Sequence, residues 1–276
     1  MRKVAVLGPR GTNGHEVARR IINTSDSDVV FCARNESILE TCVQDSCVGV
    51  VPIENSSKGL VEDVIGFWLR NMENELPITV VGEAHMPIAH ALLVSKDCPG
   101  IEAIRVVKSH PQALAQCSRF INERNLHALP ASSTAQAAQE IAESAESDTA
   151  AIASVFAAEV YGLSVAQPHI ENHSGNTTRF HILGRETPAA TGRDRTAVIL
   201  ELPDRTLALA SVLSPIGYLG ANLSSIHSIP LGNPGEYAFY CEFNLHRDCV
   251  EGKKIVACMR ELTKRMRVLG SYPQQK

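Results

Sequence analysis

The sequence predicts an α/β fold followed by a smaller α+β unit, and three observations support this. Up to residue 184, short apolar runs alternate with stretches of helical periodicity, the pattern of an α/β sheet. Residues 184–195 have the composition of a linker, and beyond them the predicted order changes to strand, helix, strand, strand, helix. The length of 276 residues fits two domains at about 150 residues each.

The first elements illustrate the pattern. Residues 4–7 form an apolar strand, the turn 8–11 contains two glycines and a proline, and a helix is expected through residue 22. Residues 48–52 are a continuous apolar run, which is typical of a strand buried on both faces. Apolar residues then recur at helical spacing over 60–68.

The remaining elements follow from the same periodicities. Before the linker, strands are predicted at 89–94, 104–107, 150–153 and 180–183, and helices at 114–121, 135–145 and 155–161. After it, strands are predicted at 196–202, 223–229 and 236–243, and helices at 206–218 and 251–267. This βαββα order suits a small sandwich that acts as a separate regulatory or ligand-binding domain.

Composition excludes several classes of function. The net charge of -4 and the aromatic content of 5% argue against a nucleic-acid binder, which needs a basic face and stacking side chains. The eight cysteines form no CxxC pair, whereas a secreted disulfide scaffold is shorter and denser in cysteine. Residues 206–235 lack Asp, Glu, Lys and Arg, but Pro215, Gly217 and Gly220 interrupt them, so no membrane helix is expected. We therefore expect a reduced, cytoplasmic protein with a small-molecule ligand.

Several predicted helices begin with groups that could bind an anion. Ser109 and Gln112 have the spacing of a capping box, Ser133 and Thr134 begin a second one, and residues 52–57 lead from a buried strand into a helix. Helix starts offer free N–H groups and a positive dipole end, and ligands of open α/β sheets lie beyond the strand ends. If these starts converge, the pocket suits a dicarboxylate. A capping box alone is more often only a cap.

Two other interpretations of glycine and histidine motifs are weaker. Gly8, Gly11 and Gly14 follow a strand but lack the GxGxxG spacing of a dinucleotide loop. His169 and His173 could share a helix face, yet neighbouring Pro and Gly residues favour a loop and no third ligand is evident. We therefore expect neither a cofactor nor a metal.

The segment Asn176-Thr177-Thr178-Arg179-Phe180 is the sharpest signal, because it stands at the entrance of a predicted strand. Arg179 is the only Lys or Arg between positions 154 and 184. A guanidinium pairs bidentately with a carboxylate, so Arg179 could hold one of the ligand's acid groups. The alternative is an ordinary surface arginine in a polar loop.

Six motifs together resemble the prephenate dehydratase family over nearly the whole chain. They are Gly8-Pro9-x-Gly11-Thr12, Val51-Pro52-Ile53-Glu54-Asn55-Ser56, Ser109-His110-Pro111-Gln112 with Gln116-Cys117, Ser133-Thr134-x-x-Ala137, Tyr161-Gly162-Leu163 and Asn176-x-Thr178-Arg179-Phe180. Several motifs in the right order are far more specific than any one alone.

The resemblance implies a fold and a domain division. It implies a catalytic domain at 1–186 whose two α/β lobes resemble periplasmic binding proteins, with the substrate between them. The lobes are expected at about 1–80 plus 168–186 and at 81–167. An α+β ACT regulatory domain, a βαββα sandwich, is expected at 195–276. The family also suggests a homodimer or homotetramer.

The implied reaction converts prephenate into phenylpyruvate, with loss of carbon dioxide and of the ring hydroxyl, in phenylalanine biosynthesis. By resemblance, Thr178 aids departure of the hydroxyl and Arg179 helps to hold the carboxylates. The resemblance places the remaining substrate contacts at Thr12, Glu54, Asn55, Ser56, Ser109, Gln112, Gln116, Ser133, Thr134, Asn176 and Phe180. Aromatisation drives the reaction, so no cofactor is implied.

The chain also departs from the family pattern. Asn13 and Gly14 replace an aromatic residue and a hydroxyl residue. The effector motifs GALV and ESRP appear as Leu207-Ala208-Leu209-Ala210 and His227-Ser228-Ile229-Pro230, although Asn222 is retained. We expect an altered amino-acid sensor with weak or absent response to L-phenylalanine. Two alternatives remain, a prephenate decarboxylase that does not aromatise the ring and a non-catalytic amino-acid-sensing binding protein.

Overall fold

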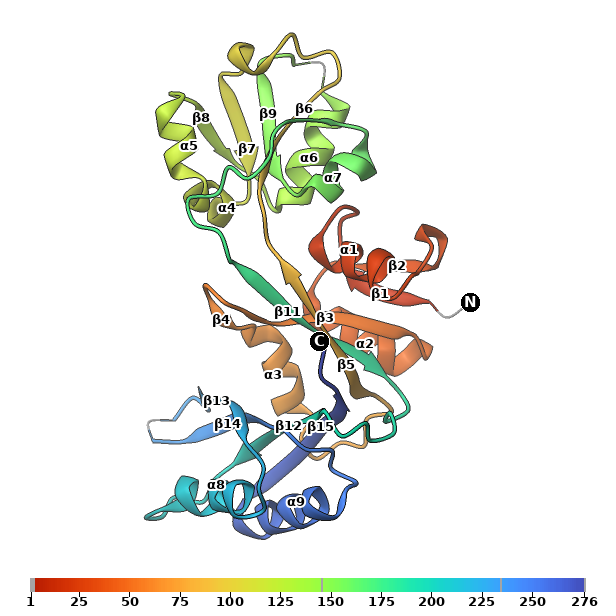
Figure 1. The fold of residues 1–276 in the computed structure, drawn as a ribbon, viewed down its shortest axis with the longest axis vertical. Coiled ribbons are helices and arrows are strands. Elements are labelled where there is room, and N and C mark those ends of the chain that lie inside the picture. Colours follow the sequence, from red (N-terminus) through yellow and green to blue (C-terminus); the bar gives the residue numbers. More distant parts are fainter. Residues whose placement is uncertain (1–2, 145, 234, 276) are drawn as a thin grey trace.

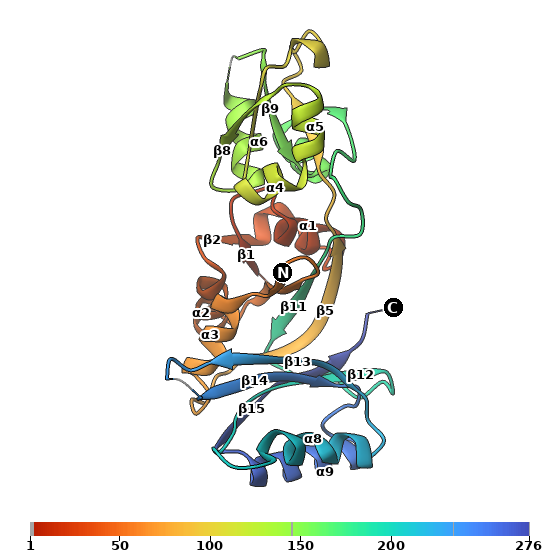
Figure 2. The same ribbon diagram turned by 90° about the vertical axis from the view of Figure 1, so that its left-hand side faces the viewer.

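The computed structural model describes residues 3–144, 146–233 and 235–275. The molecule is elongated, with three parts stacked along its long axis (Figures 1 and 2). The N-terminal lobe lies in the middle, the second lobe lies at one end and the C-terminal domain lies at the other.

The N-terminal lobe is built on a mixed sheet. Its strands are β1 (Val4–Leu7), β2 (Val29–Cys32), β3 (Val48–Asn55), β4 (Gly59–Leu60), β5 (Thr79–Pro87) and β11 (Thr177–Gly184). The order is β5-β11-β3-β1-β2, with β1 parallel to both neighbours and β11 antiparallel to both of its own. Its α-helices are α1 (Asn13–Arg20), α2 (Asn35–Asp45) and α3 (Glu62–Arg70).

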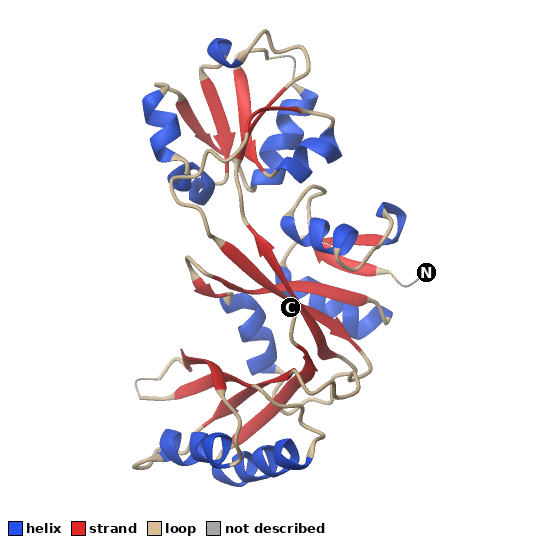
Figure 3. Ribbon diagram, viewed as in Figure 1, coloured by secondary structure: helices blue, strands red, loops and turns tan. Residues whose placement is uncertain are grey.

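The second lobe has a separate sheet in the order β10-β6-β9-β7-β8. Its strands are β6 (Ala91–Val94), β7 (Val106–Ser109), β8 (His127–Pro130), β9 (Thr149–Ala153) and β10 (Ser164–Gln167). Its α-helices, which cover both faces of the sheet (Figure 3), are α4 (Pro111–Gln116), α5 (Ser118–Glu123), α6 (Thr134–Glu143) and α7 (Val155–Tyr161). The single helix expected over 114–121 is divided into α4 and α5 at Cys117.

Two chain segments connect the lobes (Figure 1), as expected for a two-lobed fold. The first crossing follows Pro87 rather than residue 80, because β5 continues the sheet of the N-terminal lobe. The second crossing precedes Thr177. Sequence periodicity missed β5, since Gly82, Glu83 and His85 interrupt its apolar pattern.

The C-terminal domain packs two helices on one face of a four-stranded antiparallel sheet (Figure 2). Its elements are β12 (Asp194–Glu201), α8 (Ala208–Tyr218), β13 (Leu223–Pro230), β14 (Tyr237–Phe243), α9 (Val250–Leu262) and β15 (Arg265–Pro273). The helix expected over 251–267 is wrong at its end, because β15 begins at Arg265 and makes the order βαββαβ. Among the residues that the structure describes, no helix is long and apolar enough to cross a bilayer.

The C-terminal domain is joined to the N-terminal lobe through β15. Gly270 of β15 pairs in parallel with Val80 of β5, so strands of both parts form one continuous sheet. A Cβ atom on Gly270 would lie 2.0 Å from the Val80 carbonyl oxygen, closer than any real contact. The other face of the C-terminal sheet contributes Tyr240 and Tyr272 to the core around Trp68. The junction therefore depends on close backbone approach and on a shared apolar core.

Replacing Gly270 with alanine should weaken this junction. The added methyl group must displace the β5 backbone, so we expect Gly270→Ala to lower the free energy of unfolding by about 1–3 kcal/mol. Urea unfolding followed by circular dichroism measures the change.

Gly14→Ala is the matched control. Gly14 lies in the first turn of α1, and its added Cβ would find its nearest neighbour at 3.7 Å, an ordinary contact. It should raise the free energy of unfolding by about 0.5–1 kcal/mol, because glycine is disfavoured in helices. Equal stability of the Gly270→Ala protein and the wild type would contradict the tight strand junction.

Candidate active site

A cavity of about 470 Å³ lies between the two lobes. The N-terminal lobe contributes Ser56, Ser57 and Lys58, from the loop after β3. The facing wall is formed mainly by α4 and by the two connecting segments. It comprises Ile88, His90, Gln112, Ala115, Gln116, Glu171, Asn172, His173, Ser174, Gly175 and Asn176. Four residues predicted for substrate contact, Ser56, Gln112, Gln116 and Asn176, therefore line one cavity.

Neither Thr178 nor Asn55 lines this cavity, but the two residues pair with each other, and Asn55 bonds to Asn176, which does line it. The antiparallel register of β3 and β11 places these two residues opposite each other. The Asn55 amide nitrogen, Nδ2, lies 3.0 Å from Thr178 Oγ1 and 2.8 Å from Asn176 Oδ1. The Ser56 and Ser57 hydroxyls also donate to Asn176 Oδ1. Asn55, Ser56, Asn176 and Thr178, predicted from separate motifs, thus form one hydrogen-bonded cluster, in which Thr178 is 9% exposed.

The second-lobe wall depends on the short helix α4. Gln112 and Gln116 on this helix face the cavity, and Gln116 Oε1 lies 2.9 Å from His90 Nε2. The prediction that Ser109 caps this helix is wrong. His110 is the cap, and its Nδ1 accepts from the Gln112 backbone. Ser109 ends β7 with its side chain buried, donating to the Ile152 carbonyl, and it does not line the cavity.

Arg179 and Glu54 face away from the cavity, which corrects their predicted substrate contacts. Successive side chains of a strand point to opposite faces, so Arg179 lies opposite to Thr178, and Glu54 opposite to Asn55. Nη1 of Arg179 lies 2.8 Å from each carboxylate oxygen of Glu242, and its Nη2 lies 3.1 Å from Glu54. The only fixed cation of its sequence segment is therefore paired with protein carboxylates.

Four other predicted contacts have structural roles. Phe180 is 3% exposed and packs in the core beneath α1, on the same face of β11 as Thr178. Thr12 is the N-cap of α1 and Ser133 is the N-cap of α6, where Thr134 is the first helical residue. The side chains of Thr12 and Ser133 accept hydrogen bonds from the backbone of their helices, and none of the four lines the cavity.

Sequence reasoning missed a lysine and two histidines that line the cavity. Lys58 comes two residues after the matched motif, and His90 and His173 lie in the connecting segments. His169 and His173 lie in a loop, as expected, and no metal-binding group of three or more His, Cys, Asp or Glu side chains occurs within the described ranges. These segments have no periodicity, so only their place between two lobes could have identified them.

Polar groups are also buried behind β11, between the N-terminal lobe and the C-terminal domain. Tyr240 and Tyr272 both place hydroxyls near Glu242 and near His181 Nε2. Burial lowers the pKa of His181 below its usual value, so it is neutral at pH 7. Burial opposes ionisation of Glu242, but contact with His181 and the charge of Arg179 outweigh it and hold the Glu242 pKa well below its usual range.

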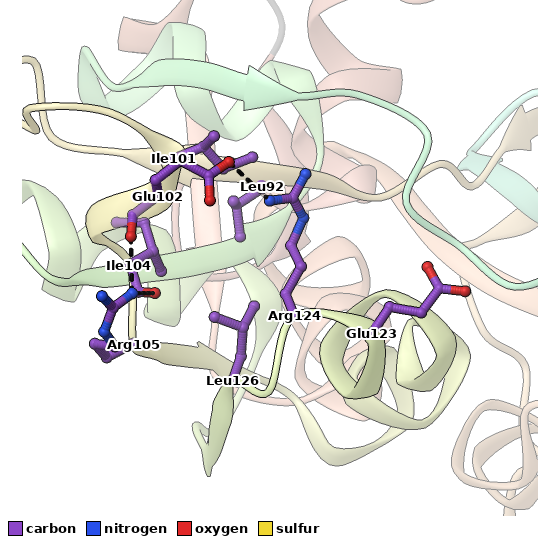
Figure 4. Close-up of a pocket in the computed structure, with 8 residues that line it drawn as sticks. All are labelled: Leu92, Ile101, Glu102, Ile104, Arg105, Glu123, Arg124 and Leu126. Carbon is purple, nitrogen blue, oxygen red and sulfur yellow. Dashed lines mark hydrogen bonds and ion pairs between the residues drawn. The ribbon is translucent and has the colours of Figure 1, made fainter.

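A second cavity, of about 480 Å³, lies on the second lobe but contains none of the predicted site residues (Figure 4). Its two arginines are already engaged. Arg124 Nη1 lies 3.4 Å from the Glu102 carboxylate, and Arg105 donates to the Glu102 carbonyl at 2.8 Å. Both guanidiniums therefore already have protein partners, and we assign no role to this cavity.

The predicted regulatory residues fall in different places on the C-terminal domain. Leu207 and Leu209 line a groove of about 530 Å³ beside α8. Asn222 and Ser228 are exposed and lie outside that groove. His227 faces the N-terminal lobe, where its Nε2 lies 3.8 Å from the Glu54 carboxylate.

Comparison with known proteins decides the family. The profile described as Prephenate dehydratase matches residues 4–188. The chain belongs to the prephenate dehydratase family. The bifunctional chorismate mutase/prephenate dehydratase of Neisseria gonorrhoeae is 31% identical over 276 residues, covering 98% of this chain and 74% of that protein.

Solved structures share the same fold. Prephenate dehydratase from Arthrobacter aurescens, in complex with L-Phe, matches with a TM-score of 0.86 and 29% identity, covering 98% of this chain and 90% of that one. GqqA, a quorum-quenching acylase, has a TM-score of 0.87 at 22% identity, covering 99% and 98%, and shows a common fold alone. The family assignment makes this chain an enzyme of prephenate dehydration in phenylalanine biosynthesis, which confirms the expected activity and the two-lobed α/β fold.

The buried histidine should make the fold sensitive to acid. Because the pKa of His181 is lowered in the folded chain, the unfolded chain takes up a proton first as the pH falls below about 6.5, and stability then decreases. In urea unfolding between pH 7.5 and 5.0, His181→Gln should remove up to about 1.4 kcal/mol per pH unit of this slope. An unchanged slope would contradict a neutral buried His181.

Proposed function

We propose that prephenate binds in the inter-lobe cavity with its ring hydroxyl directed at Thr178. The observation that carries this proposal is the Asn55–Thr178 hydrogen bond beside a polar cavity lined by both lobes. Asn55 Nδ2 donates to Thr178 Oγ1, which occupies an acceptor site and leaves the hydroxyl proton of Thr178 free for a ligand.

The proposed chemistry needs one well-placed hydroxyl. The bond from the ring to its carboxylate breaks, carbon dioxide departs, and the electron pair forms the aromatic system as the carbon–oxygen bond breaks. Thr178 gives its hydroxyl proton to the departing oxygen, which leaves as water, and the threonine oxygen regains a proton from solvent. A threonine hydroxyl is a very weak acid and donates only as charge builds on that oxygen. Positioned proton transfer contributes roughly 10²–10⁴-fold to such steps.

The two substrate carboxylates need other partners than Arg179. We propose Lys58 for charge, with His173 and the amides of Gln112 and Gln116 as hydrogen-bonding partners, since all four line the cavity. The side-chain carboxylate of the substrate stays on the product and can be held firmly. The ring carboxylate leaves as a neutral gas, so tight binding of it would slow the reaction.

The C-terminal domain, residues 195–276, is proposed to be an ACT-type domain that binds an amino-acid effector, in a homodimer or homotetramer. Its order of elements and its groove beside α8 support this. Leu207 stands where the family motif has glycine, and its φ of 60° is a left-handed conformation that favours glycine. Its side chain is 71% exposed at the groove, where it changes the surface offered to an effector.

Thr178→Ala should abolish turnover and leave binding intact. We expect the kcat for phenylpyruvate formation to fall at least about 10²-fold, because the proton donor is lost. Prephenate affinity, measured by calorimetry, should change little. Thr177→Ala is the matched control, because Thr177 is the neighbouring threonine of β11 and should retain turnover. An unchanged rate in Thr178→Ala would remove the assigned role.

The same assay separates the alternatives. Proton NMR of the product shows aromatic signals for a dehydratase and only vinylic signals for a non-aromatising decarboxylase. Prephenate that survives incubation with the chain would indicate a binding protein.

L-phenylalanine should bind weakly or not at all. The substituted motifs place Leu207 and His227 where the family pattern has other residues. Calorimetric titration should therefore show no tight binding, and turnover should be unchanged by added L-phenylalanine. Tight binding would contradict the proposed change in the sensor.

A further inference from the structure

The pair Asn55–Thr178, which lies beside the cavity, has a counterpart on the other face of the same two strands. Thr178 is followed in β11 by Arg179, and Asn55 is preceded in β3 by Glu54. The front pair is hydrogen-bonded at 3.0 Å, and the back pair is joined by an ion contact of 3.1 Å. Neighbouring residues of these two strands thus carry the hydroxyl of Thr178 on one face and the buried guanidinium of Arg179 on the other.

The C-terminal domain supplies the main partner of that buried charge. Glu242 of β14 accepts from Arg179 with both carboxylate oxygens, each 2.8 Å from Nη1. Its own side chain is 1% exposed and is held by the Tyr240 and Tyr272 hydroxyls. The Glu242 carboxylate therefore has little freedom, and neither does the guanidinium bound to it.

Glu242 makes the shortest contact with Arg179 in a cluster of charged side chains. Three carboxylates, those of Glu54, Glu83 and Glu242, surround the guanidiniums of Arg179 and Arg195, so the cluster holds one more carboxylate than guanidinium. Glu242 is the carboxylate nearest to Arg179, so its removal takes away the strongest contact of that guanidinium although Glu54 and Glu83 remain.

The partner strand β3 is irregular at this point. Its register against β11 shifts at Ile53, between Pro52 and Glu54, whereas β11 itself pairs with β5 without a shift from Thr177 to Ile182. Such bulges re-aim side chains and depend on local contacts to hold them. The contacts of Arg179 with Glu54 and Glu242 hold the two strands together next to Thr178.

We propose that Glu242 is a positioning residue for the reaction: through Arg179 it holds the β11 segment that places Thr178 Oγ1 against Asn55 and the cavity. This proposal rests on the proposed role of Thr178. It makes a carboxylate of the C-terminal domain part of the support for the catalytic hydroxyl.

The effect should be on kcat rather than on KM. A displacement of about 1 Å at a reacting group can cost up to roughly 10²-fold in rate. The cavity residues proposed to hold the carboxylates, such as Lys58 and Gln116, have no contact with Glu242 in the described chain. Substrate affinity should therefore be almost independent of it.

Glu242→Gln tests the proposal in the full-length chain, because glutamine keeps the shape and removes the charge. We expect kcat to fall about 10–100-fold and KM to stay within about 3-fold. Glu36→Gln is the matched control. Glu36 pairs with Arg70 in the N-terminal lobe, away from Arg179, and its loss should leave both constants unchanged. Thermal unfolding of each variant reports whether it is folded.

A double-mutant cycle separates positioning from a general structural role. Thr178→Ser keeps the hydroxyl but removes the methyl group that restricts its rotation. If Glu242 acts through residue 178, Glu242→Gln should reduce kcat much less in the Thr178→Ser background than in the wild type. Equal reductions in both backgrounds would contradict positioning, as would a wild-type kcat in Glu242→Gln.

Two further outcomes are distinguishable. Full turnover in Thr178→Ala would defeat the proposed function itself, whereas loss there combined with full turnover in Glu242→Gln would defeat only this inference. If Glu242→Gln does not fold, Tyr240→Phe removes one hydroxyl from the carboxylate while keeping the charge. It should lower kcat about 3–10-fold with KM unchanged, and an unaltered kcat in that variant would overturn the proposal.

Discussion

The antiparallel register between β3 and β11 is the constraint on which the active site depends. The two strands are separated by more than a hundred residues of sequence, and the register brings Asn55 opposite Thr178. A slip of one residue would turn every side chain of β11 to the other face, exchanging Thr178 with Arg179. Burial of Phe180 on the core side specifies that register energetically. The same strand pair thus sets both the cleft chemistry and the contact with the C-terminal domain.

The position of this strand pair also explains the molecule's architecture. β11 returns from the second lobe and lies between β3 and β5, and β5 in turn pairs with β15 of the C-terminal domain. Catalytic and C-terminal parts therefore share one sheet and one apolar core. Only β5 separates β15 of the C-terminal domain from β11, so a change of packing in that domain can affect the strand that carries the proposed proton donor.

Local apolar runs predicted six strands of the lobes, β1, β3, β6, β7, β9 and β11. The resemblance to the family implied the two lobes and selected Asn55, Ser56, Asn176 and Thr178 from separate motifs. Sequence reasoning failed where tertiary contacts decide. Arg179 stood out as a lone cation, but strand alternation and Glu242 determine where its guanidinium lies. β15 was missed, and its first three residues were assigned to the preceding helix, because Arg265 and Arg267 interrupt its apolar residues. The long-range partners of these residues were invisible in local periodicity.

A crystal structure of the Thr178→Ala chain with bound prephenate tests the central claim most directly. We expect the substrate between Gln116 and Asn176, with its ring hydroxyl nearest to residue 178 and Arg179 still paired with Glu242. Prephenate bound outside the inter-lobe cavity, or held by Arg179 after separation from Glu242, would contradict it.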